Sequence, residues 1–185
     1  MRATVLLLGA ALTLGALACG AHPIAGPSTP KGVALASLTV TSKSFQATNN
    51  VIPVEYSCDG SNRSPQITWS APPEGTQSIA IVAEDPDASS GAFVHWVVYD
   101  LGGDTRTLAE GVDVSSVGRA GINDNQSDAY YGPCPPKMEI HHYVFRVFAL
   151  NAPLNLPAGV DKARLYGAMN GHVLADGALI ATFSH

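Results

Sequence analysis

Two stretches of sequence decide the fold of this chain: FVHWVVYD at residues 93–100 and HYVFRVFAL at residues 142–150. Both are nearly continuous runs of β-branched, aromatic and aliphatic residues. A strand that is exposed on one face alternates apolar and polar residues, whereas a strand that is buried on both faces does not. The two stretches therefore predict central strands, each covered on both faces by other parts of the molecule.

Shorter strands are predicted on both sides of this pair. Runs of similar composition occur at residues 38–42, 66–70, 78–84 and 178–183, and proline or glycine separates each from its neighbours. Strands this numerous, with little sequence left for helices, indicate a mostly-β sandwich.

One helix is predicted late in the chain. Asp161 can cap its first turn, and Leu165, Met169, Val173 and Leu174 follow at a spacing of about three or four residues. We therefore expect a C-terminal helix that continues through Val173 and Leu174.

The composition limits the classes of partner. The chain has 185 residues, with 10 Lys and Arg against 15 Asp and Glu, so its formal net charge is −5. Only 14% of the residues are charged, below the roughly 25% of an average soluble domain. Proteins that bind nucleic acid hold the phosphate backbone with clustered Lys and Arg, and this sequence has no such cluster. Nucleic acid is therefore not expected as a main partner.

The N-terminus is predicted to be an export signal over residues 1–18. Arg2 is followed by an uncharged run that is shorter than the about 20 residues of a membrane span. The run ends at LGALACG, which resembles a bacterial lipobox, so Cys19 is predicted to be acylated and to become the first mature residue. Cleavage after Ala18 or Ala21, with Cys19 unmodified, is the alternative. We expect a protein of the cell envelope, in the periplasm or on the outer surface, held to a membrane only by this lipid anchor.

Two further segments follow from this interpretation. Residues 19–37 are rich in Gly, Pro and Ala, which predicts a flexible tether, and residues 38–185 form a single domain. Export places Cys58 and Cys134 in an oxidising compartment. They are interpreted either as a disulfide or as two buried free thiols.

Standard catalytic signatures are absent from the sequence. It contains no G-x-S-x-G elbow, P-loop, H-E-x-x-H, C-x-x-C or G-x-G-x-x-G motif. The polar candidates that remain are the acidic turn EDPDA at residues 84–88, His95 and His141, together with the proline-rich loop YGPCPP at residues 131–136.

Strand alternation predicts which way these side chains point. His95 is expected on the same face as Phe93, Val97 and Tyr99, and His141 on the same face as Tyr143 and Phe145. His142 is expected to point the opposite way.

Taken in order, these segments resemble the phosphatidylethanolamine-binding protein family, and within it the bacterial branch of Raf-kinase-inhibitor-like proteins. The resemblance covers about residues 39–183. The motifs that carry it are YSCDG at 56–60, DPDA at 85–88, FVHWV at 93–97, GPCPP at 132–136, HHYVF at 141–145 and GHVLA at 171–175.

The resemblance implies both a fold and a site. The fold is a β-sandwich with central antiparallel-rich sheets, Greek-key-like, with one C-terminal helix and short peripheral helical turns. The site is a small pocket for phosphate-like groups, acetate or the headgroup of phosphatidylethanolamine. Family members often have Gly shortly after the proline pair, where this chain has Lys137-Met138-Glu139. The implied pocket residues are Asp85, Asp87, His95, Cys134, Pro135, Pro136, His141 and Tyr143.

The chemistry of these residues is compatible with an anion. Imidazoles beside a carboxylate are biased toward the charged form, and protonated His95 and His141 then donate hydrogen bonds. Tyr143 can add a hydroxyl donor, whereas Asp85 is expected to orient one imidazole. We therefore expect a small phosphoryl or carboxylate anion to bind more tightly as the pH falls through the histidine range.

Three functions remain open from the sequence. The first is a non-catalytic binding protein without a cofactor, which by resemblance modulates a partner such as a kinase or a protease. The second is a hydrolase that uses Asp85 and His95 as acid and base. The third is a metal-binding module built from Asp85, Asp87, His95 and His141.

Overall fold

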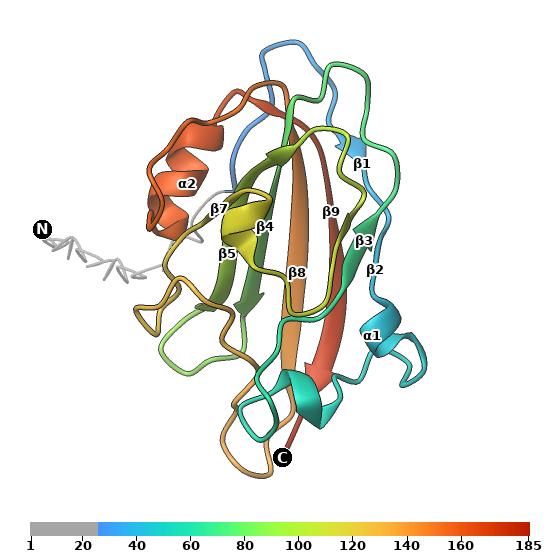
Figure 1. Cartoon of the computed structure of the whole chain (residues 1–185), viewed down its shortest axis with the longest axis vertical. Helices are drawn as coiled ribbons and strands as arrows, with labels where there is room; N and C mark the ends of the chain where they lie inside the picture. Colours follow the sequence, from blue (N-terminus) through green and yellow to red (C-terminus); the bar gives the residue numbers. More distant parts are fainter. Residues whose placement is uncertain (1–25) are drawn as a thin grey trace, which may run out of the picture.

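Two sheets make up the domain in the computed structural model, which describes residues 26–185 (Figure 1). The predicted signal peptide and Cys19 lie outside these residues. The larger sheet has the strand order β1-β9-β8-β4-β5-β7 and the smaller one the order β2-β3-β6. The elements are β1 (Ala36–Ser37), β2 (Val40–Thr41), α1 (Lys43–Gln46), η1 (Val54–Tyr56), β3 (Ile67–Trp69), β4 (Ser78–Asp85), β5 (Phe93–Gly102), β6 (Thr107–Leu108), η2 (Val114–Ser116), β7 (Arg119–Ala120), β8 (His141–Leu150), α2 (Lys162–Met169) and β9 (Val173–Phe183).

The prediction of a mostly-β fold is confirmed. Strands β4, β5, β8 and β9 pair antiparallel with one another, and the short β1 runs parallel to β9. Residues 93–100 lie in β5 and residues 142–150 in β8, and both strands lie inside the larger sheet on either side of β4. The helices are α2 and short peripheral turns, as the resemblance implied.

A separate apolar cluster covers each face of the larger sheet. Toward the smaller sheet lie side chains that include Trp96, Val98, Phe145 and Val147. The cluster on the other face joins Ala80, Val82, Val97, Tyr99 and Phe148 of the sheet to Leu165 and Met169 of α2. Burial on both faces explains why β5 and β8 show no alternation of apolar and polar residues.

Helix α2 begins where the sequence predicted and ends earlier. The Asp161 carboxylate accepts a hydrogen bond from the backbone N–H of Arg164 at 2.8 Å, so the predicted cap is confirmed. The continuation of the helix through Val173 and Leu174 is wrong, because both residues belong to β9. The turn falls at Gly171, whose φ of +77° lies in the left-handed region that favours glycine.

A β-bulge in β5 changes the predicted direction of His95. Ala83 of β4 pairs with Trp96 and Glu84 pairs with Val94, so His95 is the extra residue between them. A bulge interrupts strict alternation and turns the extra side chain away from its expected direction. The expectation that His95 shares a face with Val97 and Tyr99 is therefore wrong, because those two residues pack under α2. The expected neighbour Phe93 does lie beside His95, with 4.9 Å between the ring centroids.

Part of the predicted tether is attached to the sheet. Ala36 and Ser37 form β1 and pair with Ala175 and Asp176 of β9. Further upstream, the backbone N–H of Ser28 donates to the side-chain oxygen of Asn170 at 3.1 Å. The folded part of the chain therefore begins before Leu38, where the sequence had placed the boundary.

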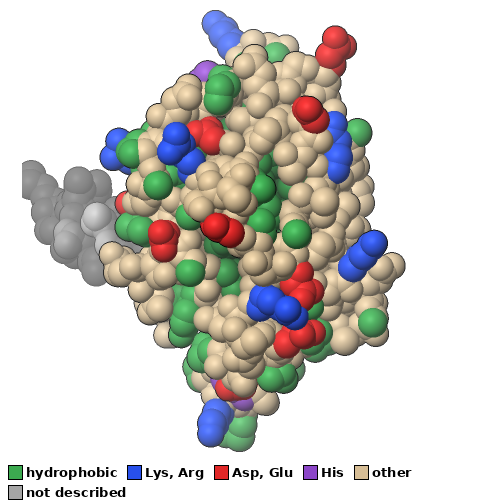
Figure 2. Space-filling model, viewed as in Figure 1, with side chains coloured by type: hydrophobic (Ala, Val, Ile, Leu, Met, Phe, Trp, Pro, Cys, Tyr) green, Lys and Arg blue, Asp and Glu red, His purple; other side chains and the backbone are tan. Residues whose placement is uncertain are grey.

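The molecular surface agrees with the low charge of the sequence. Figure 2 shows acidic and basic side chains spread over the visible face, without a continuous basic patch. Within residues 26–185, no helix has the length and apolar character that crossing a bilayer requires.

Candidate functional site

A cavity of about 400 Å³ opens where β4 ends and where β5 and β8 begin. Its volume lies within the range of about 300–1,000 Å³ that is typical of small-molecule sites. Its walls come from the acidic turn after β4, the start of β5 and the proline-rich loop before β8. The lining residues are Asp85, Ala88, Ser89, Ser90, Phe93, His95, Asn125, Tyr131, Cys134, Pro135, Pro136, Glu139 and His141.

A buried ion pair joins two neighbouring strands at this cavity. Asp85 is the last residue of β4 and His141 is the first of β8, so antiparallel pairing brings them together. The Nδ1–H of His141 donates to Oδ2 of Asp85 at 2.7 Å, and both side chains are less than 10% exposed. The other carboxylate oxygen of Asp85 accepts the backbone N–H of Asp87 at 2.8 Å. Asp85 thus orients one imidazole, as expected.

The second ring nitrogen of His141 also faces a carboxylate. Nε2 lies 3.2 Å from Oε2 of Glu139, whose side chain is more than half exposed. Burial by itself lowers the pKa of His141, but the hydrogen bonds to Asp85 and Glu139 outweigh it and raise the pKa above its ordinary value. The charged form of His141 is therefore favoured inside the cavity.

His95 is in the opposite electrostatic situation. Its Nδ1–H donates to the backbone carbonyl of Tyr131 at 2.6 Å, which leaves Nε2 as the ring atom available to a ligand. Burial lowers the pKa of His95, and the Tyr131 carbonyl and the charge of Asp85 offset this only in part. The expectation that both imidazoles are biased toward the charged form therefore agrees with the raised pKa of His141 but not with the lowered pKa of His95.

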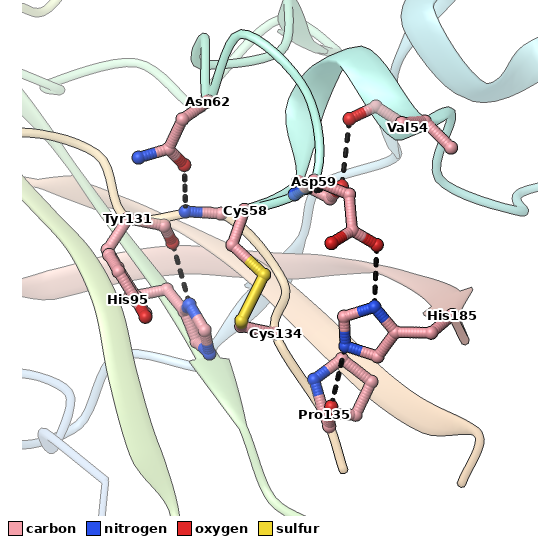
Figure 3. The surroundings of a disulfide bond; sticks show 11 residues. Val54, Cys58, Asp59, Asn62, His95, Tyr131, Cys134, Pro135 and His185 are labelled. Carbon is pink, nitrogen blue, oxygen red and sulfur yellow. Dashed lines mark hydrogen bonds and ion pairs between the residues drawn. A yellow bond between two sulfur atoms is a disulfide. The ribbon is translucent and has the colours of Figure 1, made fainter. Parts of the chain in front are cut away.

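A disulfide fixes the proline-rich wall of the cavity. Cys134 is bonded to Cys58, with Cα atoms 5.5 Å apart, which settles the alternative that the sequence left open (Figure 3). Next to it, the backbone N–H of Gly132 donates to the side-chain oxygen of Asn62 at 2.6 Å. A Cβ atom on Gly132 would overlap the carbonyl oxygen of Tyr56, so the two loops approach as closely as only glycine allows.

The structure gathers six of the eight residues in the implied pocket at the cavity, and two lie elsewhere. Asp87 pairs with His142 on the outer side of the sheet, with Oδ2 2.7 Å from Nδ1. The backbone N–H of His142, followed by its side chain, lowers the pKa of Asp87. Tyr143 packs edge-on against His95 at 5.2 Å between ring centroids, and within residues 26–185 its buried hydroxyl has no hydrogen-bond partner. His142 points away from the cavity, as alternation predicted.

Sequence reasoning missed several lining residues. Ser89 and Ser90 directly follow the acidic turn, and their position after a proline-stiffened turn was the available signal. Glu139 lies two residues before His141. Asn125 comes from the loop that leads into the YGPCPP motif at residues 131–136, but it belongs to no motif that the sequence analysis identified.

The four residues of the predicted metal site do not converge. Asp85 contacts His141, whereas Asp87 contacts His142. Among residues 26–185, the side chains that do place ligand atoms together are Cys58, Cys134 and His185. Asp85 is also hydrogen-bonded to His141 rather than to His95, so the acid–base pair of the hydrolase alternative is not a hydrogen-bonded dyad.

The fold is an open β-sandwich, and a half-buried polar cavity lies at one end of its central strands. These two features together define the class of this protein. The phosphatidylethanolamine-binding protein family matches residues 41–184, and the chain belongs to this family.

Similar proteins come from distant microorganisms. A UPF0098 protein of Aquifex aeolicus is 42% identical over 154 residues, which cover 80% of this chain and 89% of the relative. LppC of Mycobacterium tuberculosis, described as a candidate lipoprotein, is 35% identical over 147 residues, covering 79% of this chain and 72% of the relative.

Solved structures show the same fold. A crystal structure from Chlamydia trachomatis, described as a candidate homologue of the family and called CT736, has a TM-score of 0.74 and 33% identity, and the match covers 80% of this chain and 98% of that one. YbcL of E. coli, described as a member of the mammalian family, has a TM-score of 0.71 and 28% identity, with the same coverage.

Proposed function

We propose that this protein is a non-catalytic binding protein. Its cavity binds a small molecule that has a phosphoryl group at one end and a positively charged group at the other. Phosphoethanolamine, which is the headgroup of phosphatidylethanolamine, is the representative ligand of this kind. The observation that carries the proposal is the cluster of Asp85, His141 and Glu139 beside His95, whose pKa burial lowers. The name of the family points to the same chemistry.

The charges at the cavity favour a zwitterion over a simple anion. Two carboxylates and one imidazolium leave one negative charge in excess, and among residues 26–185 no Lys or Arg lines the cavity. A phosphate alone would meet net repulsion there, because like charges in a partly buried site repel. An ammonium group near Glu139 and Asp85 compensates for the excess, while the phosphoryl end lies toward the histidines.

Neutral donors are available for the phosphoryl oxygens. Ser89 and Ser90 carry hydroxyl groups and Asn125 carries an amide, and all three line the cavity. Nε2 of His95 can accept a hydrogen bond from a monoprotonated phosphate, or can itself take up the proton. Either exchange makes binding stronger at lower pH.

Calorimetry with three ligands tests this proposal. We expect phosphoethanolamine to bind more tightly than inorganic phosphate or ethanolamine at pH 7, and each phosphoryl ligand to bind more tightly at pH 5.5 than at pH 8. His95→Gln should reduce the pH dependence, because it keeps a polar side chain without the titrating ring, whereas His141 still titrates in the cavity. His172→Gln is the matched control, since His172 pairs with Asn151 and does not line the cavity.

Two results would contradict the proposal. One is a flat pH profile for the phosphoryl ligands, and the other is equal affinity for phosphate and phosphoethanolamine. Release of phosphate from phosphoethanolamine during the titration would favour the hydrolase alternative instead.

We also propose that the protein is exported and anchored through acylated Cys19. The relative from Mycobacterium tuberculosis that is described as a candidate lipoprotein supports this location. Intact mass spectrometry of the protein from its own cell envelope tests it, because acylation adds a lipid mass at Cys19, whereas cleavage after Ala21 removes that residue. A partner enzyme at the rim of the cavity, such as a kinase or a protease, is a further part of the proposal that rests on resemblance alone.

A further inference from the structure

We propose that the Cys58–Cys134 disulfide is the oxidised form of a metal site. After a dithiol reductant opens the bond, the two thiolates and the imidazole of His185 bind one divalent ion of the zinc class. The disulfide and the ion are therefore alternative occupants of one place on the surface, beside the proline-rich wall of the cavity.

The ligand atoms are already gathered. The two sulfur atoms and a ring nitrogen of His185 all lie within 4.8 Å of one another, and within residues 26–185 no other group of three such side chains does so. Tetrahedral zinc, with bonds of about 2.0–2.3 Å to nitrogen and sulfur, holds its ligand atoms about 3.3–3.8 Å apart. The Cα atoms of the two cysteines are 5.5 Å apart, so rotation of the side chains can bring the sulfur atoms to the separation that zinc requires.

His185 is held in the orientation that a metal ligand needs. Its Nδ1 lies 2.5 Å from Oδ2 of Asp59, and its Nε2 lies 2.7 Å from the carbonyl oxygen of Pro135 (Figure 3). Metal-binding histidines commonly donate the second ring N–H to a carboxylate, which fixes the ring and strengthens the ligand. Asp59 supplies that carboxylate, so Nε2 is the nitrogen that exchanges its contact with Pro135 for the ion.

The same two loops provide every part of the site. Asp59 follows Cys58 and Pro135 follows Cys134, so each cysteine carries one of the two contacts of His185 on its next residue. Two soft sulfur ligands and one imidazole are a donor set that suits zinc and disfavours magnesium or calcium. Solvent occupies the fourth position.

The exchange of the disulfide for the metal ion conserves electrons and protons, and the disulfide is accessible to a reductant. The reducing dithiol gives two electrons and two protons to the disulfide, which becomes two thiols, while the reductant becomes a disulfide. On binding, the ion displaces a proton from each thiol and also the proton that Nε2 of His185 donates to the carbonyl oxygen of Pro135, so that His185 binds as the neutral imidazole. Cys134 is exposed and Cys58 is half-buried, so a reductant can reach the bond.

Titration with Co²⁺ tests the proposal. The protein is reduced with a phosphine, freed of reductant under argon, and titrated while thiolate-to-cobalt charge-transfer bands are recorded. We expect one ion per chain in the reduced protein, displaced by Zn²⁺, and none in the oxidised protein. Asp59→Asn should weaken binding by about 10–100-fold, as losses of a carboxylate that orients a ligand do, and His185→Ala should weaken it further.

His142→Ala is the matched control and should bind Co²⁺ as the unaltered protein does, because His142 also pairs with an aspartate but lies outside the site. Three results would overturn the proposal. They are the absence of stoichiometric binding after reduction, binding that His185→Ala leaves unchanged, and loss of the sheet signal in circular dichroism on reduction. No cavity ligand is present in this experiment, so its outcome is independent of the proposed function.

Discussion

His95 and His141 show how environment sets the charge of one residue type. Both imidazoles are buried at the same cavity, and burial lowers the pKa of each. His141 has a carboxylate at each ring nitrogen, whereas Nδ1 of His95 meets only a neutral carbonyl. The hydrogen-bond partners of each imidazole ring, rather than its burial, therefore decide whether the charged or the neutral form is favoured.

The two histidines should affect the pH dependence of stability with opposite sign. His141 has a raised pKa, so its stabilising contribution is present below the unfolded pKa of about 6.5 and is lost as the pH rises through the folded value. His95 has a lowered pKa, so stability falls as the pH drops from about 6.5 toward its folded value. Urea unfolding between pH 4.5 and 8.5 measures the free energy of unfolding. His141→Gln should remove the loss of stability on the alkaline side, and His95→Gln should remove the loss on the acidic side. A histidine NMR titration with the opposite order of pKa values would contradict this explanation.

Two aspartate–histidine pairs with equal distances allow a matched comparison of burial. Asp85–His141 and Asp87–His142 both have contacts of 2.7 Å, but only the first is buried. We expect Asp85→Asn to lower the free energy of unfolding by about 1.5–3 kcal/mol, the contribution of a charged hydrogen bond. Asp87→Asn should lower it by about 0–1 kcal/mol. Chemical denaturation of both variants at pH 7 measures the difference, and equal losses would contradict the role given to burial.

At the scale of elements, periodicity predicted the strands but not their irregularities. Apolar runs located β4, β5 and β8 because the larger sheet is buried on both faces. The bulge at His95 left no sign in the sequence, since it arises from pairing with β4 and not from a local preference. The spacing that extended the helix to Val173 was misleading because the buried face of a strand is apolar too.

The close approach of two loops at Gly132 can be tested against a glycine in an open position. A Cβ atom on Gly132 would overlap backbone atoms of Tyr56 and Ser57, so Gly132→Ala should lower the free energy of unfolding by about 1–3 kcal/mol. Gly167 lies inside α2 with no atom within 4 Å of an added Cβ. Gly167→Ala should therefore raise the free energy of unfolding by about 0.5–1 kcal/mol. Thermal unfolding of both variants should show shifts of opposite direction, and a stabilised Gly132→Ala would contradict the packing described.

At the scale of the whole molecule, the disulfide joins loops that are 76 residues apart in sequence. Closing a loop of this length restricts the unfolded chain, so the Cys58→Ser/Cys134→Ser double variant should lose about 4 kcal/mol of stability. Denaturation of the oxidised protein and of the double variant measures the loss. A change below about 1 kcal/mol would show that the restriction of the unfolded chain contributes little.

Most of the cavity could be predicted from the sequence, and its electrostatics could not. The acidic turn, the histidines and the proline-rich loop were identified because resemblance links them in order. Whether Asp85 meets His95 or His141 depends on strand register, which the sequence alone does not determine. The placement of Asp87 outside the cavity has the same cause.

The segment before Leu38 has a consequence for how the molecule behaves in a crowded solution. Strand β9 forms an outer edge of the larger sheet except where β1 pairs with it, and its backbone groups near Thr182 are occupied by Asn50 and Ile52. An uncovered strand of eleven residues would present unpaired amides and carbonyls to any other chain and would invite aggregation. Strand β1 and the segment from Asn50 to Ile52 cover this edge near its two ends, so they leave little room for a second molecule to add a strand.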